Sequence, residues 1–166
     1  FGTETGIEVA DLGIQVHGGI GYVEETGAAQ LWRDARVTAI YEGTNGIQAI
    51  DLVMRKLPLG NGQHVFGFLV EMGETVERLR TSNLAGLSDA TDRLEAALND
   101  AVAVTHFLQD AIRDGKPDVA LAGATPYLRL LAQAAGGVYL ARGALAGGDA
   151  GRIALFRFFA KNALTE

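Results

Sequence analysis

One carboxylate, Glu42, is placed by sequence where a general base could act. It is the only charged residue between Arg36 and Asp51, it follows the apolar run 37–41, and Gly43 next to it would leave open space. An apolar wall disfavours the ionised form, so we expect burial to raise the pKa of Glu42 toward the range that suits a base near neutral pH. The simpler alternative, which the residues alone favour, is a surface acid near a helix N-terminus, where the helix dipole stabilises negative charge.

A second segment, residues 15–22, has the composition of a cradle for an anion or a cofactor. Its sequence is Gln15-Val16-His17-Gly18-Gly19-Ile20-Gly21-Tyr22. Clustered glycines let backbone N–H groups approach a ligand closely. The segment does not follow a strand, so it is not the dinucleotide-binding fingerprint. The alternative is a helix C-cap followed by a turn, with His17 a residue at a helix end.

Several other kinds of site are excluded by residue types and spacing. The chain has no cysteine, which removes disulfides, thiolate metal sites and cysteine nucleophiles. His17, His64 and His106 share no HxxxH or HxH spacing, so we expect no metal site. Neither a nucleophile elbow nor a phosphate-binding GxxxxGK[ST] loop is present.

Composition bounds the class of protein. The chain has 166 residues, about one domain's worth, and 48% of them are apolar, so we expect it to fold. Its net charge is −6 and it has no run of basic residues, which argues against nucleic acid as a partner. No apolar stretch is long enough to span a bilayer. Without cysteines or a signal-like start we expect a cytoplasmic protein, and a first residue other than Met suggests a fragment.

The elements that must position these residues are all predicted to be helices, because the apolar period is helical almost throughout. Residues 3–16 carry two apolar stripes, which predicts a deeply buried helix that ends at the glycines of 18–21. A short helix follows over residues 27–36. A third begins after Thr44 and Asn45, whose side chains can cap free N–H groups. Helices of this number and size ordinarily pack on something larger, so part of their surface is expected to lack a partner.

A boundary is predicted at residues 58–62, where proline and two glycines interrupt the pattern. Beyond it, four helices with short connections predict an up-and-down bundle packed at about 20°. The predicted helices cover residues 65–79, 90–111, 118–146 and 152–164. The third is expected to begin at a capping Asp118 and to bend near Pro126 and residues 136–137. The last is apolar nearly all round and is expected to be buried on two sides. We therefore expect two domains, residues 1–57 and 58–166.

Three stretches of the first part together resemble, in order and spacing, the C-terminal signature of the acyl-CoA dehydrogenase family. They are Gln15-Val16-His17-Gly18-Gly19-Ile20-Gly21-Tyr22, Leu31-Trp32-Arg33-Asp34-Ala35-Arg36 and Ile40-Tyr41-Glu42-Gly43-Thr44-Asn45-Gly46-Ile47-Gln48. Three linked motifs are far harder to obtain by chance than any one of them. Residues 58–166 resemble the extra helical domain of a branch of that family, one that includes enzymes similar to 3-methylmercaptopropionyl-CoA dehydrogenase.

The resemblance implies an FAD enzyme that oxidises an acyl-CoA thioester to its 2,3-enoyl form. Glu42 falls on the catalytic base that removes the α-proton, while the β-hydrogen leaves as hydride to flavin N5. Gly43 matches the residue beside bound acyl-CoA, and Thr44 and Asn45 match FAD-contacting positions at a helix start. The segment matched to the FAD of a neighbouring subunit comprises Gln15, Val16, His17, Gly18 and Gly19. A homodimer or homotetramer is therefore expected, with an electron-transfer flavoprotein as the usual electron acceptor.

Two departures from the family's pattern limit what the resemblance carries. Gly46 stands where many relatives have Glu or Gln, so no side-chain contact to FAD is expected there. Residues 24–27 lack the proline common after their acidic pair, which affects only the local turn.

In the family, an N-terminal helical domain and a middle β-domain supply much of the flavin and substrate site, and this chain contains neither. The chain alone is therefore expected to be inactive and to bind FAD poorly.

Two other functions remain open at this point. The apolar seams between Val65 and Ala111 would also suit a non-catalytic helical module for interaction or oligomerisation, in which Glu42 is no longer used. An acyl-CoA oxidase would keep the flavin and pass its electrons to oxygen. The acyl chain cannot be read from this sequence, because one methylene is worth only about 1–3 kcal/mol in a hydrophobic pocket.

Overall fold

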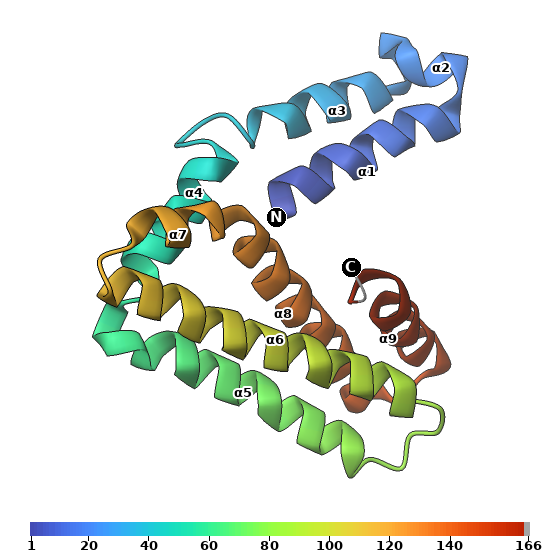
Figure 1. Cartoon of the computed structure of the whole chain (residues 1–166). Helices are drawn as coiled ribbons and strands as arrows, with labels where there is room; N and C mark the ends of the chain where they lie inside the picture. Colours follow the sequence, from blue (N-terminus) through green and yellow to red (C-terminus); the bar gives the residue numbers. More distant parts are fainter. Residues whose placement is uncertain (165–166) are drawn as a thin grey trace. The chain divides into compact units, whose positions relative to one another are not determined.

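The computed structural model describes residues 1–164, and every regular element within that range is a helix (Figure 1). The prediction of an all-α protein is therefore confirmed. The chain folds as two compact units, the first from Phe1 to Ala49 and the second from Ile50 onward. Each unit is described by itself.

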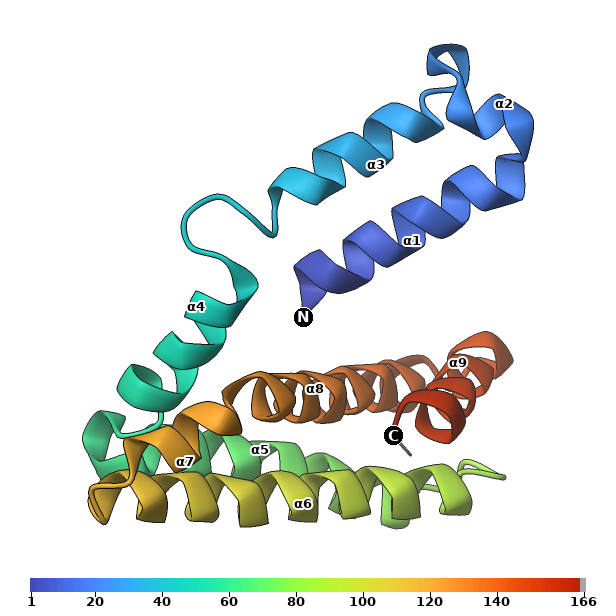
Figure 2. The ribbon, with the colours of Figure 1, turned by 45° about the horizontal axis from the view of Figure 1, so that its top comes forward.

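The first unit is a helical hairpin. Helix α1 (Gly2–His17) lies beside α3 (Ala28–Val37), and the short helix α2 (Gly19–Tyr22) and the 3₁₀ turn η1 (Glu24–Thr26) connect them (Figures 1 and 2). A loop after α3 leads into α4 (Asn45–Asp51). As predicted, a glycine ends α1, because Gly18 has φ of 65°. Gly21 is buried, and a Cβ there would lie 2.5 Å from the carbonyl oxygen of Ile14, so only glycine lets α2 pack this closely on α1.

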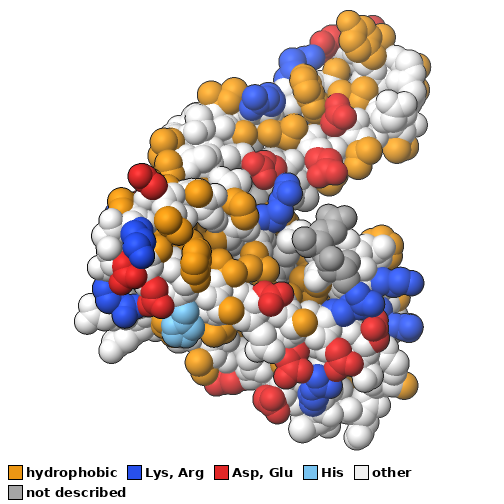
Figure 3. Space-filling model, in the orientation of Figure 1, with side chains coloured by type: hydrophobic (Ala, Val, Ile, Leu, Met, Phe, Trp, Pro, Cys, Tyr) orange, Lys and Arg blue, Asp and Glu red, His pale blue; other side chains and the backbone are white. Residues whose placement is uncertain are grey.

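The prediction that the first helix is deeply buried is wrong for this chain. None of the residues of α1 is buried, and Val16 is 86% exposed. The reason is that α3 covers only one of the two predicted stripes. Ile7, Ala10 and Ile14 are half-buried, whereas the other stripe, which consists of Val9, Leu12 and Val16, faces solvent. Figure 3 shows apolar side chains spread over the outer surface of this unit.

The second unit is a helical bundle with its own core. After the π-helical turn η2 (Leu52–Lys56) and the 3₁₀ turn η3 (Leu59–Gly62), it contains the helices α5 (Gln63–Arg80), α6 (Ser88–Arg113), α7 (Pro117–Ala122), α8 (Ala124–Gly147) and α9 (Ala150–Ala163). Helices α5, α6, α8 and α9 pack around one hydrophobic cluster. The predicted seams of the first two long helices are confirmed as core by the buried Leu69, Met72, Val76, Leu79, Leu94, Ala101 and Leu108.

One predicted helix of the bundle is in fact two. The segment predicted as a single helix over residues 118–146 breaks at Gly123, between α7 and α8. Pro126 has no N–H to donate to a carbonyl one turn earlier, so it is accommodated only in the first turn of a new helix, where it lies. Asp118 is also not the cap, because Pro117 occupies the first position of α7 and Asp118 belongs to its first turn.

The last helix is buried on one side only, contrary to the prediction of two. Phe156 and Ala160 are fully buried against α6 and α8, but Phe158 is 67% exposed and Leu155 is 52% exposed. Within residues 1–164, the helices that pack on α9 lie along one of its faces, and this leaves the opposite face open.

A buried hydroxyl pair joins α6 to α8. The hydroxyl of Thr105 donates to the carbonyl oxygen of Ala101 at 2.6 Å, so it accepts from the hydroxyl of Tyr127 at 2.8 Å. Both side chains are almost fully buried. Burial raises the pKa of Tyr127, and the hydrogen bond with Thr105 opposes that shift in part.

We predict that Tyr127→Phe lowers the free energy of unfolding at neutral pH by about 1 kcal/mol, because one buried hydrogen bond is lost. The pKa of Tyr127 is higher in the folded state than in the unfolded chain, so its contribution is complete below pH of about 10 and is lost as pH rises further. The variant should therefore lose less stability than the wild type as pH rises above about 10 in denaturant titrations. Tyr139→Phe, at an exposed tyrosine of the same helix, is the control that should match the wild type.

We predict that Leu94→Ala destabilises the bundle by about 2–5 kcal/mol, because Leu94 is fully buried and the substitution leaves a cavity. Leu155→Ala, at the exposed face of α9, should change stability by less than about 0.5 kcal/mol. Urea denaturation followed by circular dichroism measures both variants. Equal effects of the two substitutions would contradict the assignment of the core.

Candidate functional site

Glu42 lies in the loop between α3 and α4, in an uncommon backbone conformation. Its φ is 55° and that of Gly43 is 94°, so two consecutive residues are left-handed. For a residue with a side chain this conformation costs roughly 1–2 kcal/mol, and such residues concentrate at functional sites. The position of Glu42 is therefore specified by its surroundings rather than by local preference.

Of the two interpretations of Glu42, the structure agrees with the exposed acid before a helix and not with a carboxylate buried in an apolar wall. The Glu42 side chain is exposed. The two residues before it, Ile40 and Tyr41, are each 55% exposed and form no enclosure. This run continues as a turn at the end of α3, where the N–H groups of both residues donate to the carbonyl of Val37, so it wraps the helix end instead of covering the carboxylate.

A side chain from α4 holds this turn. The amide Nε2 of Gln48 donates to the carbonyl oxygen of Glu42 at 3.1 Å. A Cβ on Gly43 would lie 3.3 Å from that Nε2 and 3.4 Å from Cγ2 of Ile47, closer than side chains normally pack. Glycine is therefore favoured at position 43 by its φ and by the space that the Gln48 amide uses. The prediction that Gly43 leaves open space beside Glu42 is wrong for the described chain, because Gln48 and Ile47 fill that space.

Asn45 ties the start of α4 to the start of α1. The hydroxyl of Thr3 donates to Oδ1 of Asn45 at 2.8 Å, and Nδ2 of Asn45 donates to a carboxylate oxygen of Glu4 at 3.3 Å. The Asn45 side chain thus makes contacts between helices instead of the predicted cap. Thr44 is exposed, and its carbonyl accepts from the backbone N–H of Gln48 at 3.1 Å.

The segment at the other end of α1 is open. Gln15, Val16, His17, Gly18 and Gly19 are all exposed, and nothing lies within 4 Å of a Cβ built on either glycine. Nδ1 of His17 lies 2.8 Å from the carbonyl oxygen of Gly13. A carbonyl only accepts, so Nδ1 is the donor, and Nε2 is the ring nitrogen that a ligand could reach.

The structure separates the predicted site residues into two groups. Glu42, Gly43, Thr44 and Asn45 lie together near the N-terminal end of α1, through the contacts of Asn45 with Thr3 and Glu4. The segment 15–19 lies at the opposite end. At 1.5 Å per residue, Gln15 is about 16 Å along the helix axis from Glu4. The two groups therefore present contacts at two distant places on the same unit.

Beside the second group is a hollow of about 520 Å³. Its lining includes Tyr22 and Trp32, together with an ion pair of 2.8 Å between Arg33 and Glu24. Tyr22 ends the predicted 15–22 segment, and none of the residues 15–19 lines the hollow. The bidentate contact with Arg33 holds the pKa of Glu24 below its usual value. The partner of Arg33 thus lies outside its own helix, in the preceding turn η1.

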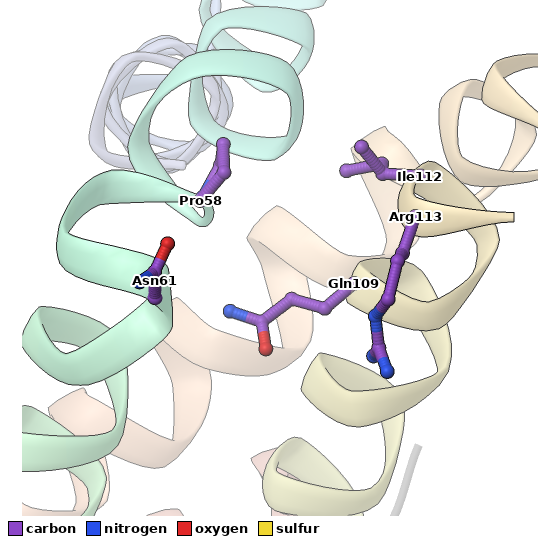
Figure 4. A pocket seen from close by; sticks show the side chains of 5 residues that line it. All are labelled: Pro58, Asn61, Gln109, Ile112 and Arg113. Carbon is purple, nitrogen blue, oxygen red and sulfur yellow. The ribbon is translucent and has the colours of Figure 1, made fainter. Parts of the chain in front are cut away.

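Another hollow, in the second unit, lies between the 58–61 turn and the end of α6. It measures about 430 Å³ and is lined by Pro58, Asn61, Gln109, Ile112 and Arg113 (Figure 4). Gln109 donates to the carbonyl oxygen of Leu57 at 2.9 Å, which fixes the turn on the helix. No predicted site residue lies here.

Two further observations concern kinds of site. Among residues 1–164, the structure brings together no group of three or more His, Asp or Glu side chains that could hold a metal ion. In the same part of the chain, no helix has both the length and the apolar character needed to cross a bilayer.

Gln48 is the residue of this site to which sequence reasoning assigned no role. The signal for it is the spacing Asn45-Gly46-Ile47-Gln48, since a Gln three residues after a helix-starting Asn is placed to fold back over the preceding loop, as in a capping box. The Gln48 side chain bonds to the carbonyl oxygen of Glu42, and the sequence pattern alone does not predict this acceptor.

Comparison with known proteins accounts for both units. Residues 1–57 match the sequence model described as acyl-CoA dehydrogenase, C-terminal domain, and residues 68–166 match the one described as acetyl-CoA dehydrogenase C-terminal like. The whole chain is 40% identical to 3-methylmercaptopropionyl-CoA dehydrogenase of Ruegeria pomeroyi, of which it covers 30%.

Two other relatives match smaller parts. Butyryl-CoA dehydrogenase of Syntrophomonas wolfei is 35% identical over 54% of this chain and 15% of its own length. The short-chain specific acyl-CoA dehydrogenase of Rattus norvegicus is 46% identical over 29% of this chain and 12% of its own. The chain thus spans less than a third of the length of these curated relatives. Because the two family matches cover nearly all of it, the chain belongs to the acyl-CoA dehydrogenase family.

Proposed function

We propose that this chain works as the C-terminal part of an FAD-dependent acyl-CoA dehydrogenase, with Glu42 as the base that removes the α-proton of an acyl-CoA thioester. The observation that carries the proposal is the turn at Glu42 and Gly43, which the side chain of Gln48 holds. A carboxylate is kept at an exposed position by a left-handed backbone, next to an exposed glycine, in a segment that matches the family.

The proposed reaction breaks two C–H bonds and forms one C=C bond. The Glu42 carboxylate accepts the α-proton, which is acidic once the thioester carbonyl is polarised. The β-hydrogen departs with its electron pair, so the acyl chain is oxidised by two electrons. A bound flavin supplies the acceptor for that hydride. The part of this chain in the step is to place one carboxylate oxygen at the α-carbon and to present the exposed backbone of Gly43 beside the thioester.

The residues present fit partial contacts to FAD at two places. At Gln15–Gly19, exposed glycine backbone and Nε2 of His17 can meet polar parts of the cofactor. At Thr44 and Asn45, exposed polar atoms flank the start of α4, although both ends of the Asn45 amide already have partners that a cofactor contact would have to share. About 16 Å of α1 separates the two places. That one chain contacts the FAD of its own subunit and the FAD of a neighbour is proposed on the family alone.

Other features of the complete enzyme are proposed on the family alone. Acyl-CoA is the substrate class, an electron-transfer flavoprotein is the proposed electron acceptor, and a homodimer or homotetramer is the proposed assembly. The acyl chain is not assigned. The relatives are named for butyryl, short-chain and 3-methylmercaptopropionyl substrates, which differ from one another. A cytoplasmic location stays a prediction.

The chain of 166 residues by itself should not retain FAD. Both proposed contact groups are exposed, and the hollow of their unit is lined by none of them. We expect less than about 0.1 FAD per chain after incubation with FAD and desalting, since few contacts cannot offset the entropy of binding. A yellow preparation with stoichiometric flavin would contradict the two-place description of the site.

In the complete enzyme, Glu42→Gln should abolish reduction of the flavin by acyl-CoA. The amide keeps the size of the side chain but cannot accept the α-proton, so the anaerobic bleaching rate should fall by roughly 10²- to 10⁴-fold or more. Stopped-flow absorbance with a panel of acyl-CoAs measures it. The control is Glu8→Gln, at an exposed acid of α1, which should bleach like the wild type.

The same preparation separates the alternatives. If no thioester bleaches a flavin-loaded wild type, or if Glu42→Gln bleaches normally, the assignment of Glu42 fails. If the complete protein holds no FAD, the non-catalytic interaction module is favoured. Oxygen uptake during turnover without an added electron acceptor would identify an oxidase.

A further inference from the structure

We propose that Gln48 is a positioning residue for the base. Its side-chain amide holds the backbone of Glu42 in the left-handed conformation and so aims the carboxylate at the α-carbon. The inference rests on the proposed function of Glu42. It adds a residue that acts through Glu42 and needs no contact of its own with substrate or cofactor.

The bond that carries the inference runs from a helix to the turn before it. Nε2 of Gln48 donates to the carbonyl oxygen of Glu42 at 3.1 Å, across six positions of sequence. Gln48 belongs to α4, whose start is fixed on α1 by the two hydrogen bonds of Asn45. Because α4 is fixed on α1, the hydrogen bond from Gln48 also fixes the peptide group that follows Glu42.

Gly43 gives independent support. The peptide between Glu42 and Gly43 carries the accepted carbonyl, and φ of Gly43 is 94°, a value that residues with a Cβ rarely adopt. A Cβ at Gly43 would also lie 3.3 Å from the donating Nε2. The turn is thus shaped so that the Gln48 amide can approach it, and Gly43 has a reason to be glycine apart from its proposed place beside the substrate.

The direction of a base matters because proton removal needs a short and aligned approach. A left-handed Glu is unfavourable by itself, so a turn released from Gln48 is expected to populate ordinary φ values. A rotation about φ of this size moves the carboxylate by ångströms, and a misplacement of about 1 Å can cost roughly 10²-fold in rate.

One test of the bond needs no activity. In the chain of 166 residues, NMR can follow φ of Glu42 by its three-bond coupling and by the amide-to-Hα contact within the residue, which is close at positive φ. We expect the positive φ to be lost in Gln48→Leu, which removes the donor, and in Gln48→Glu, whose carboxylate cannot donate. Gln30→Leu, at an exposed glutamine of α3, should leave Glu42 unchanged. Retention of positive φ in both Gln48 variants would overturn the proposal.

A second test measures the effect on chemistry in the complete enzyme. Gln48→Leu should lower the anaerobic bleaching rate by roughly 10- to 100-fold, while the acyl-CoA concentration for half-maximal rate changes by less than about threefold. The isotope effect of an α-deuterated substrate should rise, because proton removal becomes more rate-limiting. A loss that came only from instability would lower the fraction of active enzyme and leave the isotope effect unchanged.

The two proposals fail in different ways. If Glu42→Gln abolishes bleaching and Gln48→Leu has the rate and isotope effect of the wild type, the role of Gln48 is overturned and the proposed function stands. If Glu42→Gln bleaches normally, the proposed function fails, and Gln48 then has no base to position. Loss of positive φ with a lowered rate and a raised isotope effect supports both.

Discussion

The site depends on one backbone constraint, the left-handed conformation of Glu42. A glutamate does not adopt this conformation by preference, so contacts from elsewhere must impose it. The structure supplies them in series. Asn45 fixes the start of α4 on α1, Gln48 extends from α4 to the carbonyl of Glu42, and Gly43 gives that amide its room. Helix, turn and carboxylate are linked by a few hydrogen bonds rather than by a packed core.

The two units differ in what holds them. The second unit has a close-packed core with many alanines, and Gly137 lets α8 approach α6 so nearly that a Cβ there would lie 2.9 Å from Cδ1 of Leu94. The first unit is a hairpin whose α1 has no fully buried residue and whose Val9, Leu12 and Val16 face solvent. An open hairpin is compatible with the proposed role of the first unit, and a closed bundle is typical of a separate structural domain.

The sequence predicted helix type and core better than it predicted the environment of the site. The period of Leu69, Met72, Val76 and Leu79 gave the core of α5 directly, because one helix face is set by local spacing. The burial of α1 was predicted wrongly and the apolar wall considered for Glu42 is not there, because apolar residues show only that a face could be covered, and the covering helices must come from elsewhere. Motif spacing singled out Glu42 and the 15–19 segment within the part of the chain that matches the family, and their roles stay predictions.

Other features of the fold and of the site could not be predicted from the sequence. That α1 separates the predicted FAD contacts into two groups follows from the length of a helix, but only once its ends are known. Pro126 lies in the first turn of α8, just after the break at Gly123, whereas its sequence position was equally compatible with a bend within one helix. The bond of Gln48 joins residues of a loop and a helix, and periodicity cannot predict such contacts.

The most direct test of the account isolates proton removal from hydride transfer. 3,3-Dimethylbutyryl-CoA has α-protons but no β-hydrogen, so an enzyme of this kind can exchange its α-proton with solvent but cannot oxidise it. Incubated in D₂O with the flavin-loaded complete enzyme and followed by NMR, this thioester should take up one deuterium at the α-carbon, and Glu42→Gln should stop the exchange. Equal exchange in the wild type and in Glu42→Gln, or none in a wild type that bleaches with oxidisable thioesters, would contradict the assignment of Glu42 as the base.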